Sequence, residues 1–174
     1  MLRKNIKDKL FLLASSFLLL CTLALGEGMM APFKALDLNQ KEVTSDIFKN
    51  ADLTMINIWA TFCPPCLDEL PALGKLAKEY KGKNFQIIGI AADANSVELL
   101  ELAKEIVTKT GSDFIHLLPS DDIVNLKLKQ VSVVPETIFV DKNGKILGNP
   151  IIGSRNEAQW REIIDQNLND HVRK

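Results

Sequence analysis

Cysteine and histidine are scarce in this chain, which holds three cysteines and two histidines in 174 residues. A structural zinc site takes four such ligands, and His116 lies in an expected strand while His171 lies close to the end of the chain. We therefore expect no metal site and interpret His116 as a core or surface residue. A metal-binding module stays an alternative, which loss of metal uptake on oxidation would support.

An excess of charge of one sign is also lacking. The 21 lysines and arginines almost balance the 22 aspartates and glutamates, for a formal net charge of -1. Since the lysines are interspersed with acids, they indicate a solvated surface, and no nucleic-acid partner is expected. The length and the 47% hydrophobic content suit one domain with a proper core.

One long apolar run, Leu10 to Leu25, follows a basic start with Arg3, Lys4, Lys7 and Lys9. We expect residues 1–26 to be a signal peptide or an N-terminal membrane anchor, and residues 27–174 to be the domain. The run is shorter than the roughly 20 residues that span a bilayer comfortably, which favours a removable signal. A membrane tether through residues 10–25 is the alternative, and both interpretations export the domain.

Cys21 lies within this leader and allows a third alternative, lipidation at a processed cysteine. Residues 18–20 are all leucine, however, where small residues should precede such a cut. If Cys21 is removed with the leader, Cys63 and Cys66 are the remaining cysteines and no structural disulfide is available. Their thiols are then free for chemistry.

The pair Cys63-Pro64-Pro65-Cys66 follows an apolar segment that predicts a strand and begins an expected helix. A sulfur at a helix N-terminus is favoured as the thiolate, the reactive form. We expect Cys63 to attack a substrate disulfide, Cys66 to resolve the mixed disulfide, and Glu69, one turn beyond Cys66, to accept or relay its proton. Both prolines lack an N–H, so the reduction potential stays open.

The periodicity predicts alternating strands and helices around a buried sheet. Asn95 with Glu98, and Ser154 with Glu157, predict helix N-termini. The expected strands are 33–38, 41–43, 53–60, 85–91, 114–118, 137–140 and 145–147. The expected helical segments are 46–49, 64–80, 96–109, 122–129 and one that contains Trp160, Ile163, Ile164 and Leu168.

These features resemble the exported thioredoxin-like proteins of the TlpA/ResA/CcmG (DsbE) group, over roughly residues 31–168. The matching segments are Asn57 to Cys66, Glu69, Pro71, Val134 to Thr137, Phe139 to Asp141 and Gly144. The resemblance implies an α/β thioredoxin fold, with a central mixed sheet flanked by helices and an N-terminal β-hairpin.

The resemblance also implies the remaining site residues. Pro135 is then a cis-proline that faces a redox-active Cys63–Cys66 disulfide, and Val134 before it offers backbone groups to a substrate strand. Glu136 beside Glu69 would make the site acidic. Trp59, Pro64 and Pro65 complete the expected substrate-binding residues. Asn57 replaces a buried aspartate of cytoplasmic thioredoxins, and Phe62 replaces a common tryptophan.

The expected function is reduction of disulfides in exported proteins by dithiol exchange, without a cofactor, by a monomer in the periplasm or on the outer face of the cytoplasmic membrane. The resemblance makes apocytochrome c the leading substrate and implies a membrane electron donor of the CcdA or DsbD kind. Alternatives are a disulfide-donating oxidase or isomerase, and a protein that delivers electrons to a peroxidase. A peroxidase itself is disfavoured, since no arginine accompanies Thr61 and Cys63.

Overall fold

The computed structural model describes residues 28–172. The leader expected over residues 1–26, with its cleavage, tether and lipidation alternatives, lies outside the described residues. Within residues 28–172 there is no helix with the length and apolar character needed to cross a bilayer.

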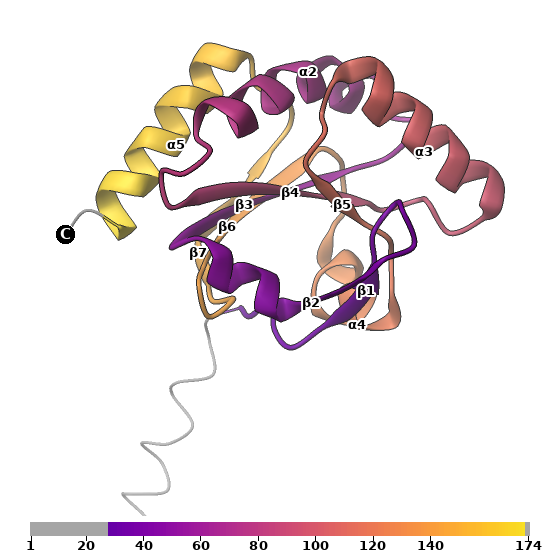
Figure 1. The fold of residues 1–174 in the computed structure, drawn as a ribbon, viewed down its shortest axis with the longest axis horizontal. Helices are drawn as coiled ribbons and strands as arrows, with labels where there is room; N and C mark the ends of the chain where they lie inside the picture. The colour runs from indigo at the N-terminus through magenta and orange to yellow at the C-terminus, as the bar shows by residue number, and fades with distance from the viewer. Residues whose placement is uncertain (1–27, 173–174) are drawn as a thin grey trace, which may run out of the picture.

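Alternating strands and helices build the domain, as the periodicity predicts (Figure 1). The strands are β1 (Lys34–Leu36), β2 (Glu42–Thr44), β3 (Leu53–Trp59), β4 (Phe85–Ala91), β5 (Ile115–Leu117), β6 (Glu136–Asp141) and β7 (Ile146–Ile152). The α-helices are α2 (Pro64–Glu79), α3 (Val97–Thr110), α4 (Asp121–Leu126) and α5 (Glu157–His171), and two 3₁₀ turns are η1 (Ser45–Asn50) and η2 (Leu128–Gln130).

The central sheet is mixed and has the strand order β5-β4-β3-β6-β7. Strand β3 lies in the middle and is buried along its whole length, which explains its nearly continuous apolar sequence. It pairs parallel with β4 and antiparallel with β6, so that Asn57 stands between Gly89 and Thr137. This register brings the segment before Cys63 next to the segment after Pro135.

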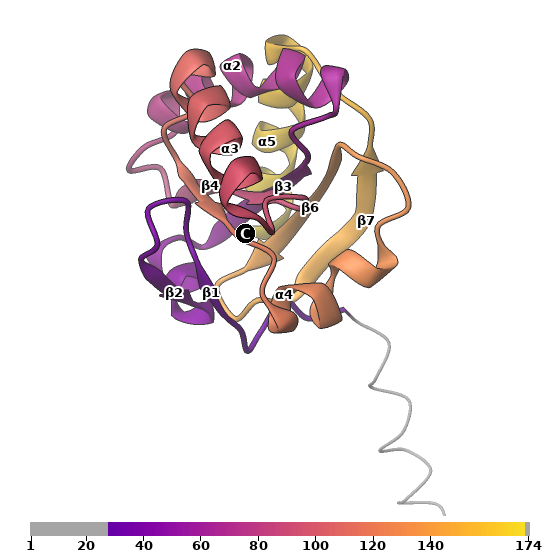
Figure 2. The same cartoon turned by 90° about the vertical axis from the view of Figure 1, so that its right-hand side faces the viewer.

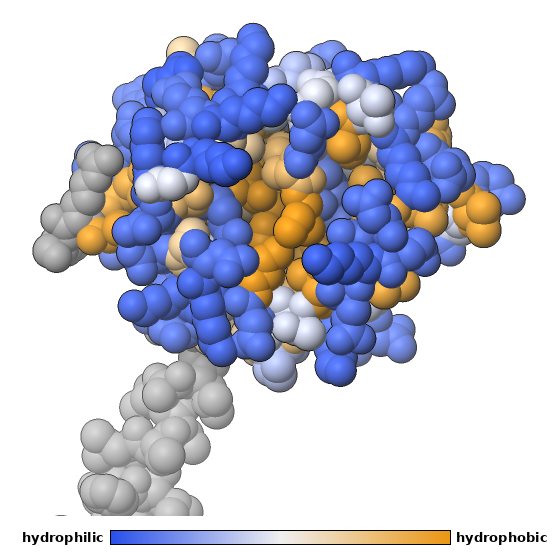
Figure 3. All heavy atoms as spheres, in the orientation of Figure 1, coloured by the Kyte–Doolittle hydropathy of each residue, from blue (hydrophilic) through white to orange (hydrophobic). Residues whose placement is uncertain are grey.

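Helices α2, α3 and α5 cover one face of the sheet, while η1, α4 and the β1–β2 hairpin cover the other (Figures 1 and 2). Each face has its own apolar core: Met55, Leu73 and Trp160 belong to the first, and Ile56, Phe48 and Ile123 to the second. Polar side chains cover most of the outer surface in Figure 3, and apolar ones show in a band at the level of the sheet.

The predicted elements are present, with two corrections at helix starts. Ser96, not Asn95, caps α3, since its hydroxyl accepts from the Leu99 N–H. The capping box of α5 consists of Asn156 and Gln159 and not of Ser154 and Glu157. In both helices a polar residue one or two positions further on takes the capping geometry.

Both edges of the sheet carry features that limit pairing. At the β5 edge, the hairpin adds two backbone hydrogen bonds, from Leu118 N to Leu36 O and from Leu38 N to His116 O. At the β7 edge, Pro150 lies within the strand and Gly148 has a positive φ of 67°. A proline offers no N–H to a neighbouring strand.

Candidate active site

Cys63 is the N-cap residue of α2 and forms a disulfide with Cys66. The Cys66 N–H donates a hydrogen bond to the Cys63 sulfur over 3.3 Å. Pro64 and Pro65 occupy the intervening first positions of the helix and have no N–H to add. The helix N-terminus therefore directs one backbone donor, the Cys66 N–H, at the Cys63 sulfur.

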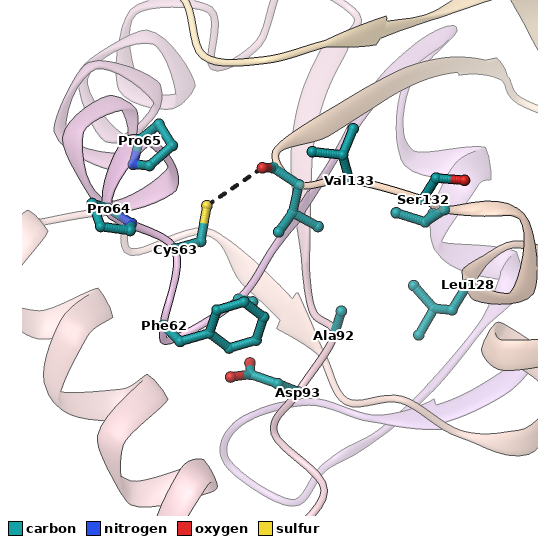
Figure 4. A pocket seen from close by; sticks show the side chains of 12 residues that line it. Phe62, Cys63, Pro64, Pro65, Ala92, Asp93, Leu128, Ser132 and Val133 are labelled. Atoms are coloured by element: carbon teal, nitrogen blue, oxygen red, sulfur yellow. Dashed lines mark hydrogen bonds between the residues drawn. The ribbon is translucent and has the colours of Figure 1, made fainter.

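The two sulfurs differ in access. Cys66 is fully buried, whereas Cys63 opens onto a cavity of about 620 Å³ (Figure 4). Although Cys63 is only 5% exposed, its place in the cavity wall suits an attacking cysteine, and the enclosed Cys66 suits a resolving one. The cavity is lined by Ala60, Phe62, Cys63, Pro64, Pro65, Ala92, Asp93, Leu128, Val131, Ser132, Val133 and Val134.

The loop before β6 faces the disulfide. The Cys63 sulfur lies 3.6 Å from the Val134 carbonyl oxygen, and the Val134–Pro135 peptide bond is cis, as the resemblance implies (Figure 4). A disulfide sulfur carries no proton, so this contact becomes a hydrogen bond only in the reduced protein. The Pro135 carbonyl in turn accepts from the Gly153 N–H at 2.8 Å. The loop is thus held between α2 and the end of β7.

Glu69 is buried on α2, one turn after Cys66, and its carboxylate is a hydrogen-bond acceptor for three groups. Asn57 Nδ2 donates to Oε1 at 2.9 Å, and both Trp160 Nε1 and the Arg155 N–H donate to Oε2 at 3.0 Å. Burial raises the pKa of Glu69 above its ordinary value, although these hydrogen bonds act in the opposite direction. A carboxyl with a raised pKa binds a proton more readily than a free one, which suits an acceptor for a thiol proton.

Asn57 lies between Glu69 and β6. Its Nδ2 also donates to Thr137 Oγ1 at 3.1 Å, while its own Oδ1 is buried without a partner among the described residues. Asn57 and Glu69 were predictable from the sequence as part of this network, whereas Thr137, Arg155 and Trp160 were not. Their contacts span up to 91 residues of sequence, so no local pattern indicates them.

The prediction that Glu136 lies beside Glu69 is wrong. Neighbouring residues of a strand point to opposite faces, and Thr137 points toward Asn57 and Glu69. Glu136 therefore faces the α4 side, where it forms a buried ion pair with Lys127 just after α4. With both side chains 5% exposed, Glu136 cannot contact a docked substrate as a free carboxylate.

Trp59, which was expected to bind substrate, has a fully buried side chain, and its role in substrate binding stays a prediction. Trp59 Nε1 donates to Nδ1 of His116 at 3.0 Å, so the His116 proton is on Nε2, which donates to the Ser112 carbonyl at 2.9 Å. Burial lowers the pKa of His116 to about 4. His116 is a neutral core residue, as one of the two interpretations above expects.

Pro64 and Pro65 are exposed and line the cavity with Val134, which agrees with their expected place at the docking surface. Phe62, which replaces a common tryptophan, lies on this surface and is 74% exposed. Asp93, just after β4, also lines the cavity and accepts hydrogen bonds from Thr61, and it was not predicted. The position of Asp93 at the carboxyl end of a buried strand was the available signal.

The described residues contain no group of three or more histidine, cysteine or acidic side chains placed to hold a metal ion. The site instead combines the Cys63–Cys66 pair with the buried carboxylate of Glu69, one helical turn beyond Cys66. What this arrangement can do chemically is exchange a disulfide with another molecule.

The Redoxin family model matches residues 26–157, which is most of the chain. The thiol-disulfide oxidoreductase ResA of Bacillus thuringiensis subsp. konkukian is 28% identical over 138 residues, covering 79% of this chain and 76% of that protein. The thiol:disulfide interchange protein DsbE of Haemophilus influenzae is 30% identical over 125 residues, covering 71% of this chain and 64% of that protein.

Among solved structures, a thiol:disulfide interchange protein of the thioredoxin family from Chlorobium tepidum superposes with a TM-score of 0.69. It is 22% identical, and the match covers 82% of this chain and 97% of that one. The fold is thus the expected thioredoxin fold. With the Cys63–Cys66 pair at the helix N-terminus, the chain is a thiol-disulfide oxidoreductase of the ResA and DsbE type, and it belongs to the Redoxin family.

Proposed function

We propose that this protein is a reductase, which transfers two electrons from Cys63 and Cys66 to disulfides of exported polypeptides. The single backbone donor at the Cys63 sulfur carries this proposal. A helix that stabilises the thiolate strongly stabilises the reduced protein and makes it an oxidant. With Pro64 and Pro65 in the first turn and Asp93 in the same cavity, that stabilisation is weak, and the reduced form gives up its electrons readily.

The exchange proceeds in two displacements. The Cys63 thiolate attacks one sulfur of the substrate disulfide, forms a mixed disulfide and releases the first substrate sulfur as a thiolate. The Cys66 thiolate then attacks Cys63, restores the internal disulfide and releases the second. The substrate is reduced by two electrons, its two thiolates take up protons, and the protein is oxidised by the same two electrons.

Glu69 supports the second displacement. Cys66 is buried and must lose its proton before it can attack. The carboxyl that follows it by one helical turn has a raised pKa because of its burial, so it takes up that proton more readily than an exposed glutamate would. Asn57, Trp160 and the Arg155 N–H fix the carboxyl in place.

We further propose export by the leader of residues 1–26, with the domain of residues 27–174 released or tethered outside the cytoplasmic membrane. An exported reductase has no soluble reducing pool around it, so its disulfide must be reduced again by a membrane dithiol donor. A donor of the CcdA or DsbD kind, and apocytochrome c as substrate, follow from the family resemblance. Mass spectrometry of the N-terminus in fractionated cells tests the leader.

The equilibrium reduction potential of the Cys63–Cys66 couple tests the direction of transfer. The protein is isolated in the form in which it accumulates in cells. It is then titrated against dithiothreitol or glutathione redox buffers, and its free thiols are counted. A value at or below about -220 mV supports the reductase. A value near about -120 mV means a disulfide-donating oxidase, and the absence of a reversible couple favours the metal-binding module.

A further inference from the structure

The cavity beside Cys63 combines apolar walls with one charged group (Figure 4). Among the twelve described residues that line it, Asp93 alone carries a charge. Its apolar lining includes Leu128, Val131 and Val133, and the Phe62 ring, which also lines it, is exposed. A ligand side chain in this cavity therefore contacts apolar surface and has a carboxylate beside it.

Asp93 is fixed in position and still has acceptor capacity. The Thr61 N–H donates to both of its oxygens at 3.0 Å, and Thr61 Oγ1 donates to Oδ2 at 2.5 Å. A carboxylate has about four acceptor sites, so these bonds do not saturate it. Within residues 28–172 it forms no ion pair, which leaves its charge uncompensated.

We propose that Asp93 is a specificity residue that selects polypeptide substrates with a lysine or arginine close to the reacting cysteine. This inference rests on the proposed function, because it names the substrate class of that same cavity. The cationic head pairs with the Asp93 carboxylate, and the aliphatic stem lies along Leu128 and Val131. An acidic residue at the same place is repelled.

The chemistry of the cavity suits this side chain better than a purely apolar one. A leucine or phenylalanine would cover the Asp93 carboxylate and remove its water without replacing it. A lysine or arginine buries comparable apolar surface and supplies a charge-assisted hydrogen bond. The Phe62 ring adds a face on which a cation is favoured.

The test uses three synthetic peptides, each with one internal disulfide and either lysine, glutamine or glutamate beside a cysteine. The second-order rate constant for oxidation of the reduced protein is measured with each peptide. Each value is divided by the rate constant for dithiothreitol with the same peptide, since a charge also alters the intrinsic reactivity of a disulfide. The corrected lysine to glutamate ratio should be about five, with glutamine between, as for a partly exposed ion pair.

Two variants test whether the lysine to glutamate ratio of the rate constants depends on Asp93. Asp93→Asn removes the charge but keeps two of the three hydrogen bonds, because the amide oxygen accepts from the Thr61 N–H and the amide nitrogen donates to Thr61 Oγ1. Asp68→Asn removes the same charge from an exposed position of α2 outside the cavity. The ratio should fall to about one in Asp93→Asn and stay near five in Asp68→Asn.

Salt provides a check that needs no variant. Between about 0.01 M and about 1 M salt the screening length falls from about 30 Å to about 3 Å, so the wild-type ratio should decline toward one. Equal rates for the three peptides, or a ratio that persists in Asp93→Asn, would overturn the role of Asp93 and leave the proposed function intact. No exchange with any peptide would overturn both.

Discussion

Trp160 Nε1 on α5 donates a hydrogen bond to the buried Glu69 carboxylate on α2 over 3.0 Å, although 91 residues separate them in sequence. The Arg155 N–H, at the turn before α5, donates to the same oxygen. The last helix of the domain thus fixes the carboxyl that follows Cys66. Since Gly153 holds the Pro135 carbonyl, the same turn reaches the docking loop as well.

Replacing Glu69 with glutamine should slow disulfide exchange by about 100-fold at neutral pH, because Cys66 loses its proton acceptor. The fold should tolerate the change, since the glutamine carbonyl can accept from Trp160, and Asn57 can turn its unpartnered Oδ1 toward the new amide. Stopped-flow measurement across pH 5 to 9, roughly the range in which these groups titrate, checks this. An unchanged pH profile would rule out the proton-acceptor role. Glu162→Gln, an exposed change on α5, is the matched control.

Glu69 should also affect how the free energy of unfolding depends on pH. Burial raises its pKa in the folded protein, so above pH 4.5 the folded state holds a proton that the unfolded state releases. The free energy of unfolding therefore falls as the pH rises from there toward the raised pKa. Glu69→Gln lacks this decline, so the difference between variant and wild type should change across that window. Urea unfolding at steps of pH measures it, and parallel curves would contradict the assignment.

His116 should change the free energy of unfolding with pH in the opposite direction to Glu69. Its pKa falls to about 4 in the fold, so below pH 6.5 the unfolded chain binds a proton that the folded protein excludes. The free energy of unfolding should drop by up to about 3 kcal/mol as the pH falls through this window. In His116→Gln the drop between pH 6.5 and about 4 should be smaller by that amount, although the variant is less stable at neutral pH. The same urea series measures both effects, and a drop of unchanged size in the variant would exclude His116 as its cause.

Removing one partner of the buried Lys127–Glu136 pair should destabilise the fold more than removing both. Glu136→Gln leaves the Lys127 ammonium buried without its counter-charge, and we expect a loss of about 3 kcal/mol in the free energy of unfolding. Combining it with Lys127→Met removes the unpaired charge and should restore most of the loss. Denaturant unfolding of both single variants and the double variant gives the coupling energy. Additive losses would show that the two side chains do not interact.

Much of the fold follows from the sequence because its signals are local. Buried strands such as β3 and β4 are apolar runs of strand length, and their predicted bounds agree with the structure to within one residue. Helix starts were less certain, since two polar residues compete for one cap and packing decides between them. Ser96 and Asn156 took the caps that the patterns had assigned to Asn95 and Ser154.

The candidate site was predictable where the chemistry lies within one motif. Cys63, Cys66 and Glu69 share a helix and its start, so spacing alone brings them together. Glu136 was misplaced because the family resemblance put the residue after Pro135 beside Glu69 without regard to the face of the strand on which it lies. Strand alternation separates them, and the partner Lys127 comes from an irregular segment that carries no periodic signal.

The edges of the central sheet affect how readily this protein releases a polypeptide substrate. A polypeptide awaiting reduction is unfolded and has free backbone groups, so an open strand edge would capture it by extending the sheet. Here the β1–β2 hairpin bonds to the segment around β5, and Pro150 interrupts the donors of β7. Contact with an unfolded chain is thereby directed to the sulfur and its cavity.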